Sequence, residues 1–218
     1  MKNRLETVIF DFDYTLANSS RAVVECANFA LETLGLPRVS AELIYRTIGL
    51  PLSEMFRKLA GEQHKDSCDE FIRLFYERAD DVMVDWTVVL ESVPRTVGIL
   101  KGCGLSLGIV STKLRLKIEA ILRRENLLES LEAIVGGEDV SEYKPNPEGL
   151  LKLIHRLDSS SARCLYVGDS ITDAKTAMRA QVPFVAVLTG VTPRDDFRSY
   201  PVYGIVEDLS ELPALIGY

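Results

Sequence analysis

Short runs of apolar residues recur along the chain, and segments with helical spacing separate them. The runs are rich in β-branched residues and cover residues 8–10, 105–110, 133–135, 164–167, 184–188 and, more weakly, 202–206. Runs of this length that alternate with helices are typical of parallel strands buried on both faces. The pattern therefore predicts an α/β protein with a parallel sheet.

The predicted helices have recognisable starts and stops. Pro94 stands at the start of one helix, and Gly104 follows its end. Asn146 is a candidate cap for another, in which Pro147 is the first residue. The apolar stripe predicted for this second helix is Leu150, Leu151, Ile154 and Leu157.

The stretch between the first and second strands holds about ninety residues, far more than one crossover helix requires. Its helices have candidate caps at Asn18 and Ser19, a break at Gly49-Leu50-Pro51, and a capping box at Ser67-Cys68-Asp69-Glu70 that opens a long helix. We therefore expect an all-helical cap domain over 17–83, inserted into a core formed by 1–16 and 84–218.

Composition narrows the function. The chain has 218 residues, of which 47% are hydrophobic and 26% charged, and its net charge is -7. A net negative charge does not favour phosphate backbones or anionic membranes, so neither nucleic acid nor a membrane is an expected partner. The four cysteines lack zinc-ligand spacing, and no run of about 18 uncharged apolar residues occurs. We expect a cytoplasmic protein.

Two aspartates follow the first strand directly. Asp11 and Asp13 are two positions apart in an extended segment, so their side chains point the same way and lie roughly 6–7 Å apart. Open α/β sheets bind ligands at this end of their strands. One carboxylate can act as a nucleophile while the other exchanges a proton with the leaving oxygen. Two acidic turn residues without function are the alternative.

Polar residues follow later strands as well. Ser111 and Thr112 come after the second run, where a hydroxyl and backbone N–H groups can hold phosphate oxygens, although such residues are often simple helix caps. Lys144 lies between Tyr143 and Pro145, in a segment that two prolines stiffen. A loop lysine is, however, usually solvated.

The fourth apolar run ends in Gly168-Asp169-Ser170-Ile171-Thr172-Asp173. Gly168 permits a close approach, and Asp173 lies one helical turn beyond Asp169. Ser170 and Asp173 also have the spacing of a capping-box variant, which is a purely structural alternative. Aspartates gathered around a phosphate would repel one another without a divalent cation, and oxygen ligands suit Mg²⁺.

These motifs, Asp11-x-Asp13-x-Thr15, Ser111, Lys144 before a proline, and Gly168-Asp169-x-x-x-Asp173, occur in order at successive strand ends. In this series the chain resembles the haloacid dehalogenase-like hydrolase superfamily over nearly its whole length, and its phosphoglycolate phosphatase branch most. The resemblance implies a Rossmann-like doubly wound parallel sheet with a helical cap.

The resemblance also implies a role for each matching residue. Asp11 would be the nucleophile that becomes an aspartyl phosphate, and Asp13 the general acid and then base. Asp11, the main-chain carbonyl of Asp13 and Asp169 would bind Mg²⁺. Ser111, with Thr112 beside it, would bind phosphate oxygens, and Lys144 would neutralise the nucleophile and the phosphate. Asp173 would orient Lys144 or a water on the metal.

Three departures from the branch pattern concern specificity. Tyr14 stands where glycine is commonest, Asn18 where aspartate is usual, and Thr112 where asparagine is more frequent. The expected function is a Mg²⁺-dependent phosphatase for a small phosphorylated metabolite, such as phosphoglycolate or pyrophosphate. A sugar phosphomutase of the β-phosphoglucomutase type and, behind it, a non-catalytic binding module are the alternatives.

Other features are less specific. The resemblance places the Gly49 loop over the catalytic aspartates, where it would contact substrate, although a simple turn between helices is the alternative. Lys113, Arg115, Lys117, Arg123 and Arg124 are expected on the solvated face of one helix. The sequence leaves a monomer and a homodimer equally open.

Overall fold

The structure, a computed structural model, describes residues 5–218 and divides the chain into two compact units. One unit combines Met1–Ala17 with Val89–Tyr218, and the other is Asn18–Val88. The sequence placed the end of the insertion at residue 83. The second unit extends further because its last helix continues to Trp86, and the Thr87 hydroxyl then donates a 2.6 Å hydrogen bond to the Met83 carbonyl.

A six-stranded parallel sheet forms the first unit. Its strand order is β5-β4-β1-β6-β7-β8. The strands are β1 (Thr7–Phe10), β4 (Ser106–Val110), β5 (Ala133–Val135), β6 (Cys164–Gly168), β7 (Phe184–Val187) and β8 (Gly204–Val206). β1 pairs in parallel with β4 on one side and β6 on the other, and its four residues are all buried. The carboxyl ends of these three strands therefore meet at one edge of the sheet.

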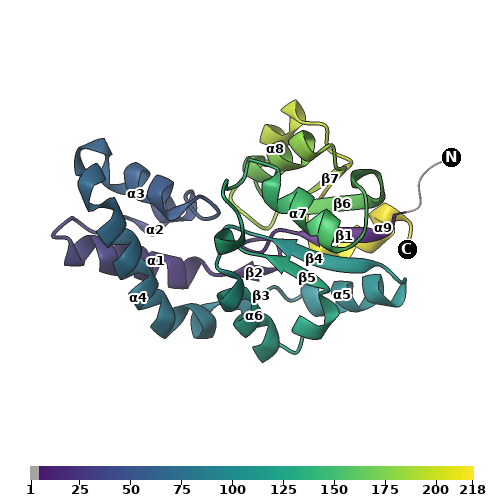
Figure 1. The fold of residues 1–218 in the computed structure, drawn as a ribbon, viewed down its shortest axis with the longest axis horizontal. Helices are drawn as coiled ribbons and strands as arrows, with labels where there is room; N and C mark the ends of the chain where they lie inside the picture. The colour runs from purple at the N-terminus through teal and green to yellow at the C-terminus, as the bar shows by residue number, and fades with distance from the viewer. Residues whose placement is uncertain (1–4) are drawn as a thin grey trace. The chain divides into compact units, whose positions relative to one another are not determined.

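Helices cover both faces of this sheet, as Figure 1 shows. They are α5 (Val93–Gly102), α6 (Arg115–Arg124), α7 (Glu148–Arg156), α8 (Ile171–Ala180) and α9 (Leu212–Ile216). Short 3₁₀ helices occupy Leu128–Ser130, Gly137–Asp139, Ser161–Arg163, Arg194–Ser199 and Leu209–Glu211. α7 and α8 share a buried cluster with Ile9, Tyr166 and Phe184, while α5 and α6 lie on the opposite face. The predicted α/β doubly wound fold is confirmed.

The second unit is helical. It contains α1 (Ser20–Thr33), α2 (Ala41–Tyr45), α3 (Leu52–Ala60), a 3₁₀ helix at Glu62–Ser67 and α4 (Cys68–Trp86). Its own buried core includes Phe56 and Phe71, whose ring centroids are 4.7 Å apart. Two short paired strands, β2 (Ala17–Asn18) and β3 (Val88–Val89), mark the places where the chain enters and leaves this unit.

Helix starts differ from the predictions in two places. The capping box at Ser67 is wrong, because the 3₁₀ helix leads directly into α4 and Ser67 makes no side-chain cap. Asn146 does accept a 2.9 Å hydrogen bond from the Glu148 N–H, but Pro147 precedes α7 instead of beginning it. At the start of α1 the N-cap position is Ser19, whose side chain makes no cap bond, while Asn18 accepts a 3.0 Å hydrogen bond from the Ser20 N–H.

The buried side of α7 also differs from the predicted stripe. Leu151 is 44% exposed, whereas Leu153 is fully buried beside Gly108 of β4. The helix begins one residue later than expected, and Leu150, Leu153 and Ile154 share its inner side. The assignment of Leu151 to the core is therefore wrong.

This difference can be measured. Replacing Leu153 with alanine should lower the free energy of unfolding by about 2–4 kcal/mol, because it opens a cavity in a packed core. Leu151→Ala, on the same helix, is the matched control and should cost less than about 0.5 kcal/mol. Urea unfolding of both variants tests the assignment, and a larger loss for Leu151→Ala would contradict it.

Candidate active site

Asp11 lies where β1 ends. Its N–H donates a 2.9 Å hydrogen bond to the Val167 carbonyl of β6, which continues the parallel ladder by one step. The residue is 4% exposed, so its carboxylate is held at the sheet edge with little water. The turn that follows contains Tyr14, whose φ of +60° is a left-handed conformation that glycine adopts more easily. That geometry explains why glycine is favoured at this position in the family that the sequence resembles.

Lys144 reaches Asp11 from the loop before α7. Its Nζ lies 2.8 Å from Asp11 Oδ1 and 2.7 Å from Asp173 Oδ1, and its side chain is 5% exposed. Burial alone opposes a charged lysine, but Asp11 and Asp173 together raise the pKa of Lys144 above its usual value. The lysine is therefore a buried cation shared by two carboxylates, and the alternative of a solvated loop lysine is wrong.

The two carboxylate oxygens of Asp173 have different partners. Ser170 caps α8, and the Asp173 carboxylate accepts a 3.2 Å hydrogen bond in return from the Ser170 N–H, so the capping box is present. Its other oxygen, Oδ1, accepts bonds from Lys144 at 2.7 Å and from the Tyr166 hydroxyl at 2.8 Å. The predicted capping box is confirmed, and the second oxygen contacts Lys144 and Tyr166 because the two oxygens face different partners. The orienting role of Asp173 stays a prediction.

Glycines make room for the carboxylates. A Cβ on Gly168 would lie 2.6 Å from the Asp173 side chain, so the predicted close approach at Gly168 is confirmed. A Cβ on Gly190, in the loop after β7, would lie 1.9 Å from Asp169 Oδ2. Asp169 itself is 5% exposed. Any side chain at position 190 would therefore displace that carboxylate.

Three buried carboxylates converge at this edge. One oxygen from each of Asp11, Asp169 and Asp173 lies within 4.8 Å of the others. Burial, reinforced by Asp173, raises the pKa of Asp11 to about 7 in spite of Lys144. Burial, reinforced by the negative charges of Asp173 and Asp11, also holds the pKa of Asp169 well above its usual range.

This donor set fits a divalent cation. No aligned hydrogen bond from the described residues reaches Asp11 Oδ1, although the oxygen forms an ion pair with Lys144. Hard carboxylate oxygens brought this close are the ligands that Mg²⁺ prefers, and a cation would offset the cost of burying their charges.

Asp13 occupies a separate part of the site. Its Oδ2 lies 3.2 Å from Lys113 Nζ, and the two side chains are 7% and 8% exposed. The prediction that Lys113 lies on a solvated helix face is wrong, because its side chain is almost buried and α6 begins only at Arg115. Lys113 lies in the preceding loop.

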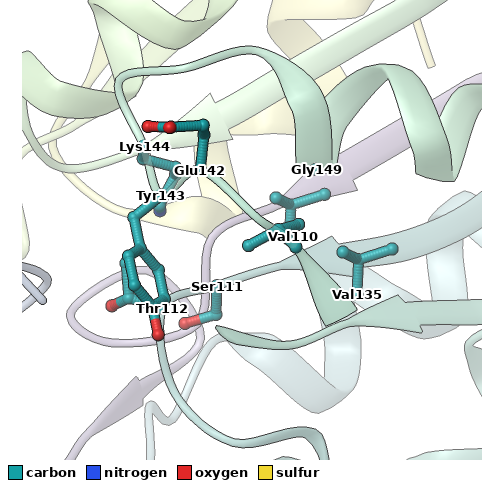
Figure 2. A pocket seen from close by; sticks show the side chains of 9 residues that line it. Val110, Ser111, Thr112, Val135, Glu142, Tyr143, Lys144 and Gly149 are labelled. Atoms are coloured by element: carbon teal, nitrogen blue, oxygen red, sulfur yellow. The ribbon is translucent and has the colours of Figure 1, made fainter. Parts of the chain in front are cut away.

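The remaining predicted residues are distributed between the two units. Ser111, Thr112 and Lys144 line one pocket together with Val110 and Tyr143 (Figure 2). Gly49 belongs to the helical unit and has a φ of +88°. Its predicted contact with substrate stays a prediction.

Three residues of the site were missed in the sequence. Tyr166 and Gly190 lie in apolar or loop segments without a recognisable motif, so no signal distinguished them. Lys113 did have a signal in the sequence. It follows Ser111 by two positions, and in an extended loop two such side chains lie on the same side. The charge run that continues into α6 concealed it.

Gly190→Ala tests the role of space around Asp169. The new methyl group should turn the carboxylate away and weaken Mg²⁺ binding by about tenfold or more. The measurement is the rise in melting temperature on Mg²⁺ titration. Gly98→Ala in α5, where nothing lies within 4 Å of the added Cβ, is the control and should leave this rise unchanged. Equal Mg²⁺ dependence in both variants would show that Asp169 does not need this space.

Asp11→Asn tests the electrostatic cost of the cluster. A carboxyl group whose pKa is raised by folding binds more protons in the folded state, so its contribution to stability falls as pH rises from about 4 to about 7. Without metal, Asp11→Asn should stabilise the protein at pH 8 by up to about 4 kcal/mol, because the raised pKa already includes the attraction of Lys144. At pH 5 the gain should largely disappear. Denaturant unfolding in EDTA at both pH values measures it, and a gain independent of pH would contradict the explanation.

Comparison with known proteins agrees with this geometry. Residues 8–187 match the family model described as haloacid dehalogenase-like hydrolase. A haloacid dehalogenase-like hydrolase from Bacteroides fragilis is 39% identical, with a TM-score of 0.93 over 96% of this chain and 100% of that one. The pyrophosphatase PpaX of Bacillus cereus is 28% identical over 98% of this chain and 97% of its own length.

A structure named a predicted phosphoglycolate phosphatase, from Haemophilus somnus, shares the fold, with a TM-score of 0.87 and 23% identity over 97% of both chains. None of the described helices is long and apolar enough to cross a membrane. The family match covers most of the chain, including every strand-end motif of the site. The chain is therefore an enzyme of the haloacid dehalogenase-like hydrolase family.

Proposed function

We propose that this hydrolase is a Mg²⁺-dependent phosphatase that releases phosphate from a small phosphorylated metabolite through an aspartyl phosphate at Asp11. The observation that carries the proposal is the position of Asp11, buried at a strand end and held 2.8 Å from Lys144. Phosphoryl transfer depends mainly on in-line positioning and on neutralisation of charge. A fixed nucleophile beside a buried cation supplies both.

Asp11 and Asp13 divide the chemistry. A carboxylate oxygen of Asp11 attacks phosphorus, and the bond between phosphorus and the leaving oxygen breaks. Asp13 gives its proton to the leaving oxygen and later takes a proton from the water that attacks the aspartyl phosphate. This second attack releases phosphate and restores both carboxyl groups. The different partners of the two aspartates, Lys144 for Asp11 and Lys113 for Asp13, support different tasks.

The side chains of Asp11 and Asp169 and the main-chain carbonyl of Asp13 would hold Mg²⁺. When bound, the ion supplies positive charge that offsets the repulsion between these carboxylates and the phosphate oxygens. Asp173 is close enough to be a further ligand, since its carboxylate belongs to the same cluster. Its bonds to Lys144 and Tyr166 favour an orienting role instead.

Ser111 and Thr112 would bind phosphate oxygens. Ser111 is 6% exposed and directly follows β4, which pairs in parallel with β1, so it lies at the same edge of the sheet as Asp11. Ser111 Oγ accepts a 3.3 Å hydrogen bond from the Lys113 N–H, which leaves its own proton available for a phosphate oxygen.

The similarity to PpaX supports pyrophosphate as a substrate, and the likeness to phosphoglycolate phosphatase structures is one of fold alone. A hydrolysis screen over pyrophosphate, phosphoglycolate, sugar phosphates and nucleoside monophosphates identifies the substrate. Interconversion of sugar 1- and 6-phosphates without phosphate release would favour a phosphomutase instead. We expect a cytoplasmic enzyme that acts as a monomer or a homodimer.

Asp11→Asn also tests the mechanism. The amide keeps the shape of the side chain but cannot attack phosphorus as an anion, so phosphate release should fall by at least about a thousandfold. EDTA should abolish wild-type activity, and Mg²⁺ should restore it. Circular dichroism controls for folding. A folded Asp11→Asn variant that kept more than about one per cent of the wild-type rate would exclude Asp11 as the nucleophile.

A further inference from the structure

The ion pair between Lys113 and Asp13 is not required by the roles assigned so far. Both side chains are nearly buried, and their charged atoms lie 3.2 Å apart. The Lys113 backbone is fixed on both sides, because its N–H donates to Ser111 Oγ at 3.3 Å and its carbonyl accepts from the Gly137 N–H at 3.0 Å. The loop therefore aims this lysine at Asp13.

Stability does not explain such a pair. Removing two charges from water costs about as much as their attraction returns, so a buried ion pair is roughly neutral compared with apolar side chains of similar size. Lysine also loses about 1.5–2 kcal/mol of side-chain entropy when it is fixed. A lysine held here is better explained by a ligand that needs a positive charge.

The position of Asp13 indicates which part of the substrate Lys113 would bind. Asp13 protonates the leaving oxygen, so one of its oxygens must come within about 3 Å of that atom. Lys113 Nζ, at 3.2 Å from Asp13 Oδ2, then lies beside the leaving group. Lys144 contacts Asp11 and Asp173 instead, on the side of the nucleophile. The two lysines thus pair with different aspartates, Lys144 with the proposed nucleophile and Lys113 with the proposed general acid.

On the basis of the proposed phosphatase function, we propose that Lys113 determines specificity by binding a negative charge on the leaving group. The preferred substrates are phosphate compounds whose leaving group carries a carboxylate or a second phosphate close to the scissile bond. An ammonium group is a compact point charge that can pair with either anion. Neutral leaving groups offer Lys113 no partner and leave it paired with Asp13.

The test compares substrates that differ only in this charge. Phosphoglycolate and 2-hydroxyethyl phosphate have leaving groups of similar size, with and without a carboxylate, and pyrophosphate supplies the phosphate alternative. Lys113→Met removes the charge and keeps an unbranched side chain that is one heavy atom shorter. It should lower kcat/KM for the preferred anionic substrate roughly 10- to 100-fold more than for 2-hydroxyethyl phosphate. The substrate more strongly affected, phosphoglycolate or pyrophosphate, identifies the anion.

Two further variants complete the test. Lys113→Arg keeps the charge and should retain much of the preference for the anionic substrate, and Lys117→Met, in α6, should leave it unchanged. In an Asp11→Asn background, which blocks turnover, calorimetry should show that Lys113→Met weakens binding of the anionic substrate. This binding measurement remains informative if Lys113→Met also disturbs Asp13.

The outcomes separate the inference from the function on which it rests. Equal losses on charged and neutral substrates, with unchanged binding in the Asp11→Asn background, would show that Lys113 only positions Asp13 and would overturn the inference. A wild-type enzyme that prefers neutral leaving groups would overturn it too. Failure of the proposed function looks different, because the wild type would then release no phosphate from any of these compounds. Thermal unfolding controls for the folding of each variant.

Discussion

The burial of Lys144 between Asp11 and Asp173 is the constraint on which the site depends. Three segments that are far apart in the sequence must meet for this contact: the end of β1, the loop before α7 and the first turn of α8. The parallel sheet brings β1 and β6 side by side, so their carboxyl ends deliver Asp11 and Asp169 to the same edge. The lysine cannot be satisfied unless that register is correct. The fold and the site are therefore specified together.

The positive charge of Lys144 does not fully offset the negative charges of the buried aspartates around it. Burial raises the pKa of Asp11 and of Asp169 even with Lys144 present, which means that their anionic forms are held at a cost in stability. A buried apolar cluster that includes Tyr166 of β6 and Phe184 of β7 stabilises the fold and offsets this cost. Functional sites commonly keep such unfavourable charges because the bound ligand needs them.

Most of the fold and the central residues of the site could be predicted from the sequence. Apolar runs located each strand of the sheet, because strands buried on both faces must be apolar whatever surrounds them. Asp11 and Asp169 were recognised because each directly follows an apolar strand, and Lys144 was recognised through the ordered series of motifs that the chain shares with the family. The wrong predictions concern segments whose local sequence pattern fits two different structures. Ser67 has capping-box spacing but follows a 3₁₀ helix, and Leu151 differs from Leu153 only by the rotation of α7.

Residues whose role depends on side-chain contacts that form only in the folded protein were beyond prediction. Gly190 matters because its missing side chain leaves space for Asp169, and Tyr166 matters because its hydroxyl meets Asp173 inside an otherwise apolar strand. Lys113 is the intermediate case, since its charge was visible but its direction was not. A run of charged residues indicates a solvated face only for residues within the helix, and Lys113 lies before the first turn of α6. Its loop is held by backbone bonds, and its ammonium group pairs with Asp13 instead, whereas Lys144 pairs with Asp11 and Asp173.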